Sequence, residues 1–353
     1  LAAETLPDDP AQAQIHYRAV LALAAGAEEL RPDDPDIARM QGEALDALDR
    51  IEGVSRLSGS TFYRFNDGSE LSRITLREVE GGIAVLDSAA NRVLFHLTDE
   101  TYRNPVTETP MTIAFSGQAV GAQVIGELFD ILWLPGSAAQ TRDSIAMLDR
   151  GGNIFNYYPN LGDTRGASLG NSSQWINPVA TGTYLDRAYV LDTGSGAIWK
   201  YFADNDFTQI TGDEVISFSD DPGLTDAADF DIYADDGSLV VLYRDGRIRY
   251  YDTRSGQLQW DETTVLQNGL TSPLISPASV KFVGSGLNAS LYVLDPGSSR
   301  LIQISRGGTA LVQFRILDEA GSDVLSKATD FAITESPFTV FVTAGDRIVW
   351  TER

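Results

Sequence analysis

Three aspartates, Asp130, Asp229 and Asp330, occupy equivalent places in a repeated sequence pattern, and their type and spacing could support chemistry. In an alignment of the repeats, Arg73 and Ser279 take the same position in two further copies. Three carboxylates converging on one place would repel one another unless a cation, a positively charged ligand or backbone amides compensated their charge. The pattern therefore predicts a shared charged site.

Two uses of these aspartates remain open. In the structural one, each carboxylate accepts hydrogen bonds from backbone amides of the neighbouring repeat. In the functional one, the carboxylates hold a cationic ligand or Ca²⁺, with Glu127, Asp226 and Lys327 nearby. Apart from this Ca²⁺, no cofactor is expected.

Other catalytic signatures are weak. The chain has no cysteine and only two histidines, His16 and His96, so zinc sites, thiol nucleophiles and histidine-based triads lack their groups. The Asp-Thr-Gly-Ser run at 192–195 matches an aspartic protease lobe, but runs at 149–151 and 295–298 hold the same turn in other repeats. A tight turn with its aspartate bonded to nearby amides is predicted there, which favours binding over catalysis.

The repeat is a strand ending near Leu-Asp, a short polar turn and a second apolar strand. Six copies occur, with equivalent positions at Leu86, Leu148, Leu191, Leu242, Leu294 and Val342. The intervals between them are close to the roughly 40 to 50 residues of a four-stranded propeller blade. The sequence therefore predicts an all-β fold, a six-bladed β-propeller.

The innermost strand of each blade should line the central channel and carry the aspartates. The predicted innermost strands are 73–77, 130–134, 181–185, 229–233, 279–283 and 330–334. The last blade lacks one strand, and an unassigned strand at 60–65 precedes the first blade. Pairing of these two ends would close the ring without an open sheet edge.

A short α-helical hairpin is predicted at residues 1–56, ahead of the propeller at 57–353. Apolar residues recur every three or four positions, at Ile15, Ala19, Leu23 and Ala27, then at Ile37, Met40, Ala44, Leu48 and Ile51. Asp34 can cap the second helix, with Pro35 in its first turn. The segment 17–35 resembles the junction of two tetratricopeptide repeats. One such repeat is too little for a peptide-binding solenoid, so a stalk or brace is expected.

The charge of the chain limits its partners. It has 50 acidic and 26 basic residues, for a net charge of -24. Such a surface repels nucleic acid and anionic headgroups. The longest apolar stretch, around 19–27, is shorter than the roughly 20 residues of a membrane span, so no membrane insertion is expected within this chain. The partner is therefore expected to be a protein or a small molecule.

The Leu-Asp repeats at 57–353 resemble NHL- and YVTN-type bacterial propellers. The chain combines a helical hairpin with such a propeller, and it contains the run 127–135 and Leu148-Asp149 near Asn153. This combination is similar to the C-terminal halves of membrane-anchored PPM-type serine/threonine phosphatases of bacteria. This resemblance implies an extracytoplasmic sensor, tethered to the membrane in a longer signalling protein. Residue 1 is Leu, which also favours a piece of a longer protein. The metal-binding aspartate motifs of those phosphatases are not recognisable here, so phosphatase activity is not implied.

Three functions follow from these observations. The first is a non-catalytic sensor or interaction domain that binds a ligand or a protein. The alternative is a propeller hydrolase or lyase with a carboxylate-lined central funnel. The third is a structural scaffold that contacts partners through its rims and its helical hairpin.

Overall fold

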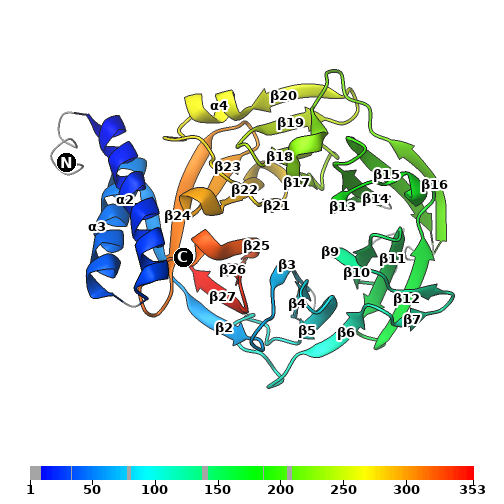
Figure 1. The fold of residues 1–353 in the computed structure, drawn as a ribbon. Helices are drawn as coiled ribbons and strands as arrows, with labels where there is room; N and C mark the ends of the chain where they lie inside the picture. Colours follow the sequence, from blue (N-terminus) through cyan, green and yellow to red (C-terminus); the bar gives the residue numbers. More distant parts are fainter. Residues whose placement is uncertain (1–8, 33, 78–80, 137–141, 186, 205–208) are drawn as a thin grey trace. The chain divides into compact units, whose positions relative to one another are not determined.

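The computed structural model describes residues 9–32, 34–77, 81–136, 142–185, 187–204 and 209–353. The chain divides into two compact units (Figure 1). One contains Leu1–Arg56 with Val312–Phe314, and the other contains Leu57–Leu311 with Arg315–Arg353. The first unit contains the two long helices and short strand segments, and the second is built mainly from strands.

The helical unit contains α2 (Pro10–Leu30) and α3 (Pro35–Glu52). Asp34 caps α3 as predicted, because its side chain accepts a hydrogen bond from the amide of Asp36 and Pro35 begins the helix. Gly53 ends α3 in the left-handed conformation, with a φ of 68° that glycine adopts without strain. No helix of the described residues is long and apolar enough to cross a membrane.

The face of α2 that is buried is not the one that the apolar spacing suggests. Ala13 and Ala24 are buried, whereas Ile15 is 60% and Leu23 is 75% exposed. The helical period is correct, but several faces of α2 carry apolar residues, so the period alone does not select the packed one.

The strand unit is a six-bladed β-propeller, and this confirms the predicted fold class (Figure 1). Blade one contains β3 (Leu71–Leu76), β4 (Ile83–Asp87), β5 (Arg92–His96) and β6 (Met111–Phe115). Blade two contains β9 (Leu128–Leu134), β10 (Ser144–Asp149), β11 (Asn153–Tyr158) and β12 (Asp163–Ser168). Blade three contains β13 (Pro178–Tyr184), β14 (Arg187–Asp192), β15 (Ala197–Asp204) and β16 (Gln209–Val215).

The other three blades follow in sequence order. Blade four contains β17 (Ala227–Ile232), β18 (Leu239–Tyr243), β19 (Ile248–Asp252) and β20 (Gln257–Asp261). Blade five contains β21 (Ser279–Val283), β22 (Ser290–Asp295), β23 (Arg300–Ser305) and β24 (Ala310–Leu317), with β1 (Val54–Ser58) as a fifth strand. Blade six contains β25 (Ala328–Glu335), β26 (Phe338–Ala344), β27 (Arg347–Glu352) and β2 (Ser60–Arg64). Short additional elements are β7 (Ala119–Val120), β8 (Gln123–Val124) and the helix α4 (Glu262–Gln267).

The predicted closure of the ring is confirmed. β2 comes from the start of the propeller and pairs antiparallel with β27 at its end, with Ser60 opposite Trp350 and Arg64 opposite Arg347. The first strand of the propeller thus supplies the outermost strand of the last blade.

A β-bulge recurs in the innermost strands and explains why most of them begin earlier than predicted. The register shifts just before Arg73, Asp130, Ala180, Asp229 and Asp330. Each of these strands therefore has a short first segment before the bulge, and only the segment after it shows a regular period in sequence.

In four blades the second strand ends in a buried aspartate that accepts hydrogen bonds from groups of its own blade. Asp87, Asp149, Asp192 and Asp295 are 0% exposed. Asp192 accepts hydrogen bonds from the amides of Ile176, Asn177 and Gly194 and from the Ser195 hydroxyl. The protease-like run at 192–195 is thus the predicted structural turn.

Candidate functional site

A cavity of about 330 Å³ lies at the centre of the propeller, and all six innermost strands contribute to its wall. We call it the central cavity. Its wall starts at the level of Arg73, Asp130, Asp229 and Asp330 and continues towards the C-terminal ends of the strands, reaching Pro135, Ala234 and Gly284. The ends of the strands thus form one side of the cavity, and charged groups form the other.

The strand registers place the predicted site residues at one position of the repeat. Arg73 lies opposite Leu86, Asp130 opposite Leu148, Ala180 opposite Leu191, Asp229 opposite Leu242, Ser279 opposite Leu294 and Asp330 opposite Thr343. The three-dimensional register agrees with the sequence alignment in blades one, two, four and five. In blade three the register places Ala180, and not the predicted Thr181, at this position. In blade six Thr343, one residue after the aligned Val342, lies opposite Asp330. Ser279 reaches the same group, because its hydroxyl donates to Asp330 Oδ1 at 2.7 Å.

The three aspartates link neighbouring blades. Each Oδ2 accepts the backbone amide of the next innermost strand: Asp130 from Thr181 at 2.6 Å, Asp229 from Val280 at 2.9 Å and Asp330 from Ile74 at 2.8 Å. The last of these bonds joins blade six to blade one. The structural use proposed for the aspartates from sequence is thus present at all three positions.

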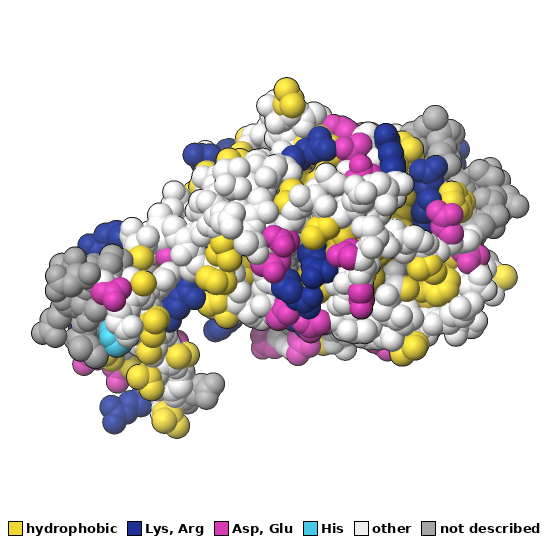
Figure 2. Space-filling view, turned by 90° about the horizontal axis from the view of Figure 1, so that it is seen from above, with side chains coloured by type: hydrophobic (Ala, Val, Ile, Leu, Met, Phe, Trp, Pro, Cys, Tyr) yellow, Lys and Arg dark blue, Asp and Glu magenta, His cyan; other side chains and the backbone are white. Residues whose placement is uncertain are grey.

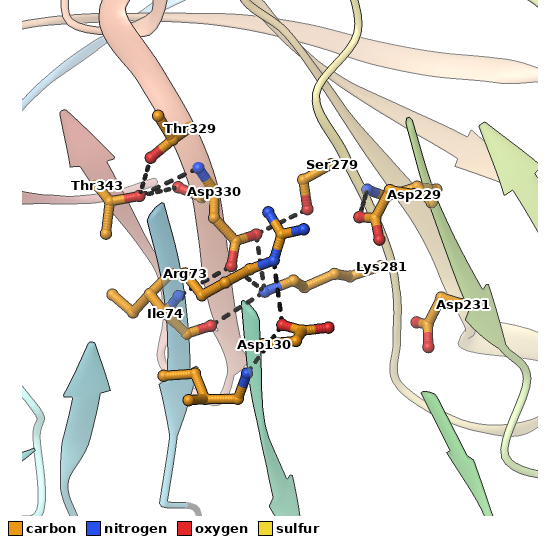
Figure 3. A network of polar contacts seen from close by, with 12 residues as sticks. Arg73, Ile74, Asp130, Asp229, Asp231, Ser279, Lys281, Thr329, Asp330 and Thr343 are labelled. Carbon is orange, nitrogen blue, oxygen red and sulfur yellow. Dashed lines mark hydrogen bonds and ion pairs between the residues drawn. The ribbon is translucent and has the colours of Figure 1, made fainter. Parts of the chain in front are cut away.

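Two basic side chains neutralise two of the three aspartates (Figure 3). Arg73 donates through Nε to Asp130 Oδ1 at 3.0 Å and through Nη2 to the Val179 carbonyl at 2.8 Å. Lys281 Nζ lies 3.0 Å from Asp330 Oδ1. The repulsion expected among the aspartates is therefore relieved by cations of the chain itself.

Sequence reasoning missed Lys281 and also Asp231, which lines the cavity from β17. Residues two apart on a strand point to the same face. Lys281 follows Ser279 by two positions, and Asp231 follows Asp229 by two. This period was the signal that could have found both.

Asp229 and Asp231 differ from the other two carboxylates because neither forms a salt bridge within the described part of the chain. Asp229 accepts the amides of Phe230 and Val280, and Asp231 accepts those of Ile232 and Phe282. Burial raises the pKa of Asp229 to about 7 and that of Asp231 to about 6. Burial likewise raises the pKa of Asp130. The wall formed by β17 is thus acidic and forms no direct salt bridge, although the charge of Arg73 partly lowers the pKa of Asp229 and that of Lys281 partly lowers the pKa of Asp231.

Aromatic groups complete the chemistry of the cavity. Trp133 of β9 and Phe282 of β21 line it together with aliphatic side chains such as Ile131. Carboxylates beside aromatic faces suit an organic cation, because both attract positive charge. Among the residues that the structure describes, no group of three or more His, Asp or Glu side chains is arranged to hold a metal ion.

Three predicted residues lie away from this arrangement. Glu127, Asp226 and Lys327 are not part of the cavity wall. Glu127 pairs with Arg150 at 2.9 Å, and Asp226 lies 3.8 Å from Arg247. All three precede the bulges, in the connections that lead into the innermost strands, so they lie before the level at which the cavity wall begins. The structure therefore does not bring them to the aspartates as expected.

Comparisons with known proteins support the fold. The sequence matches no protein-family model and no curated protein. The structure of U3-55K has a TM-score of 0.52 at 10% identity, covering 84% of this chain and 98% of that one. A chain of the nidogen/laminin complex has a TM-score of 0.47 at 14% identity, covering 70% and 80%. PorZ, a surface component of the type-IX secretion system of Porphyromonas gingivalis, has a TM-score of 0.42 at 11% identity, covering 81% and 37%. At this identity, the likeness to U3-55K concerns the fold alone.

Proposed function

We propose that the propeller is a non-catalytic binding domain that holds a small organic cation in the central cavity, against Asp229 and Asp231. One observation carries the proposal: these two carboxylates line the cavity without a salt-bridge partner among the described residues, whereas Asp130 and Asp330 each have one. A buried carboxylate without a counter-charge is costly to ionise, and a bound ammonium or guanidinium group would remove that cost.

The size and wall of the cavity support such a ligand. Its volume of about 330 Å³ lies at the lower end of the roughly 300 to 1,000 Å³ of small-molecule sites. The aromatic faces of Trp133 and Phe282 would add cation–π attraction of about 0.5 to 2 kcal/mol. A compact amine or guanidine fits this description better than a large anionic ligand.

A propeller hydrolase or lyase is the rival function. It is favoured by one observation, the pKa of about 7 at Asp229, which is suited to a general base near neutral pH. Asp231, with a pKa of about 6, would be the second carboxyl of such a site. However, Arg73 and Lys281 are engaged with Asp130 and Asp330, so the described cavity wall offers no free cation to stabilise a developing negative charge. Binding without turnover therefore remains the better account.

The wider setting follows from the resemblance to NHL- and YVTN-type propellers and to membrane-anchored PPM-type phosphatases. In this setting the domain is an extracytoplasmic sensor of a bacterial signalling protein, tethered to the membrane through the rest of a longer chain. A ligand transmits a signal only if it binds two states of the protein with different affinity.

The test is thermal unfolding with putrescine, choline or arginine amide, with CaCl₂ in parallel and ionic strength held constant with NaCl. A ligand that binds only the folded state raises Tm. We expect one of the organic cations to raise Tm of the wild type and to lose this effect in Asp231→Asn. Glu127→Gln is the matched control, since Glu127 lies outside the cavity wall.

Four outcomes would contradict this proposal. The first is that no organic cation raises Tm, and the second is an equal shift in Asp231→Asn. A shift with CaCl₂ alone would replace the organic cation by Ca²⁺. Conversion of a bound amine into a product would favour the enzymatic alternative.

A further inference from the structure

Asp229 and Asp231 present two carboxylates to the central cavity from one strand, β17, and the same hydrogen-bond pattern holds both (Figure 3). In each, Oδ1 accepts the amide of the following residue, at 2.9 Å for Asp229 and at 2.8 Å for Asp231. In each, Oδ2 accepts an amide of β21, that of Val280 at 2.9 Å or that of Phe282 at 2.6 Å. The two carboxylates therefore have the same orientation and lie one strand repeat apart.

The distance between these two carboxylates follows from the strand geometry. β17 pairs regularly with β18 from Asp229 to Ile232, since the β-bulge of this strand precedes Asp229. β21, which supplies the other two amides, is regular from Ser279 to Val283. Two residues of a regular strand span about 6 to 7 Å, so equivalent atoms of the two carboxylates are separated by about this distance. Because of this separation, a single ammonium or guanidinium group is too small to contact both.

The charge of the cavity wall favours a ligand with two positive charges. The described residues of the wall include four carboxylates and two basic side chains. Asp130 and Asp330 each form a salt bridge with one of the basic side chains, which leaves Asp229 and Asp231 without one among the described residues. Asp229 is only 8% exposed, so water compensates little of its charge. A monocation would compensate one of the two remaining carboxylates, whereas a dication would compensate both.

We propose, on the basis of the organic-cation site described above, that its ligand is a linear diamine with four or five carbon atoms between the nitrogen atoms. One ammonium group would contact Asp229 and the other Asp231. Five or six C–N and C–C bonds of about 1.5 Å, extended at tetrahedral angles, separate the two nitrogen atoms by about 6 to 7 Å. An ionised carboxylate has about four acceptor positions and the amides use two, so each can still accept a hydrogen bond from an ammonium group. Apolar side chains of the wall, such as Ile131, suit the methylene groups.

Exposed acidic groups attract the same dications whatever their length. The chain has a net charge of -24. Figure 2 shows acidic side chains next to basic ones on the side of the propeller that carries α4 and β20. Attraction to such a surface is weak, is screened by salt and does not depend on the exact separation of two charges. The dependence of affinity on linker length therefore distinguishes the central cavity from the surface.

The test is calorimetric titration of the 353-residue chain with 1,3-diaminopropane, 1,4-diaminobutane, 1,5-diaminopentane, 1,8-diaminooctane and butylamine, at pH 8 and constant ionic strength. Asp229, with a pKa of about 7, is mostly ionised under these conditions. We expect the highest affinity with four or five carbon atoms, about tenfold above that of butylamine, because the second ammonium group adds charge-assisted hydrogen bonds. The shorter and the longer diamine should bind several-fold more weakly than these.

Asp231→Asn should abolish the preference for a diamine, because only Asp229 then carries a charge for the ligand. The affinities for 1,4-diaminobutane and butylamine should come within about twofold of each other. Glu127→Gln is the matched control, since it removes one negative charge outside the cavity wall, and it should keep the preference. The length dependence of the wild type needs no variant, so it tests the proposal even if Asp231→Asn does not fold.

Failure of the diamine is separable from failure of the organic-cation site. Equal affinities for butylamine and 1,4-diaminobutane, or affinities that rise steadily with linker length, would overturn the diamine alone. Binding of choline or arginine amide without binding of any diamine would do the same. A preference for the diamine that persists in Asp231→Asn would exclude Asp231 as the second contact and overturn the proposal. If none of these cations binds, both the diamine and the organic-cation site are wrong.

Discussion

Lys281 Nζ lies 3.0 Å from Asp330 Oδ1 and also donates to the Ile74 carbonyl at 3.1 Å. One ammonium group on blade five therefore contacts blade six and blade one, at the place where the ring closes. Asp330 itself is only 2% exposed, and Lys281 is the cation that lies against its carboxylate.

Replacing Lys281 by methionine should destabilise the propeller. The change keeps the length of the side chain but leaves Asp330 without its cation, which should lower the free energy of unfolding by about 2 kcal/mol. Urea denaturation measures the loss. Lys327→Met is the control, because Lys327 is exposed, and an equal loss in both variants would contradict this account.

Asp229 should make stability fall as pH rises. Its pKa of about 7 in the folded protein exceeds the ordinary value of 3.8, so between about pH 4 and pH 7 the folded protein keeps a proton that the unfolded chain releases. Stability from this group is therefore greatest below pH 4 and decreases until pH 7. In Asp229→Asn, Tm should depend less on pH over this range. A wild-type slope that persists in the variant would show that other groups cause it.

The same ionisation should control ligand binding. A cation binds the ionised carboxylate, and a group with a pKa of about 7 is mostly protonated at pH 6 and mostly ionised at pH 8. The affinity for an organic cation should therefore rise about tenfold from pH 6 to pH 8. Calorimetric titration at the two pH values measures this change. An affinity independent of pH would exclude Asp229 from the contact.

His96 should oppose Asp229 in its effect on acid stability. It is 1% exposed, lies 4.4 Å from the Tyr63 ring between centroids, and neither ring nitrogen has a hydrogen-bond partner in the described structure. Burial lowers its pKa from 6.5 to about 4, so the stability that the neutral ring contributes is complete above pH 6.5 and is lost as pH falls towards 4.

The variant His96→Phe tests this effect. It removes no hydrogen bond, so its stability at pH 7 should match that of the wild type within about 1 kcal/mol. At pH 5 it should be more stable than the wild type by about 1 kcal/mol, since only the wild-type unfolded chain gains a proton there. Chemical denaturation at both pH values gives the comparison. A variant that is destabilised equally at pH 5 and pH 7 would point to packing instead.

Much of the site could be predicted because the repeat is encoded locally. The Leu-Asp turn and the apolar strand beside it identify each blade, and counting back from them places Arg73, Asp130 and Asp229 at one position. The register confirms that placement. Glu127 was assigned to the funnel from proximity in sequence alone, but the bulge before Asp130 separates the connection from the channel-lining part of the strand.

The sequence by itself determined the number of blades and the helical hairpin, because turn chemistry and strand period act between residues close together in the chain. The closure by the first strand followed from counting strands, since the last blade lacked one strand and an unassigned strand preceded the first blade. Only the tertiary structure decided which carboxylates find a cation. Lys281 and Ile74 are far apart in sequence, and Arg73 reaches Val179 two blades away. Such pairings depend on distances across the ring, which no local sequence pattern specifies. The pKa of Asp229 depends on its burial in the central cavity, which also follows only from the tertiary structure.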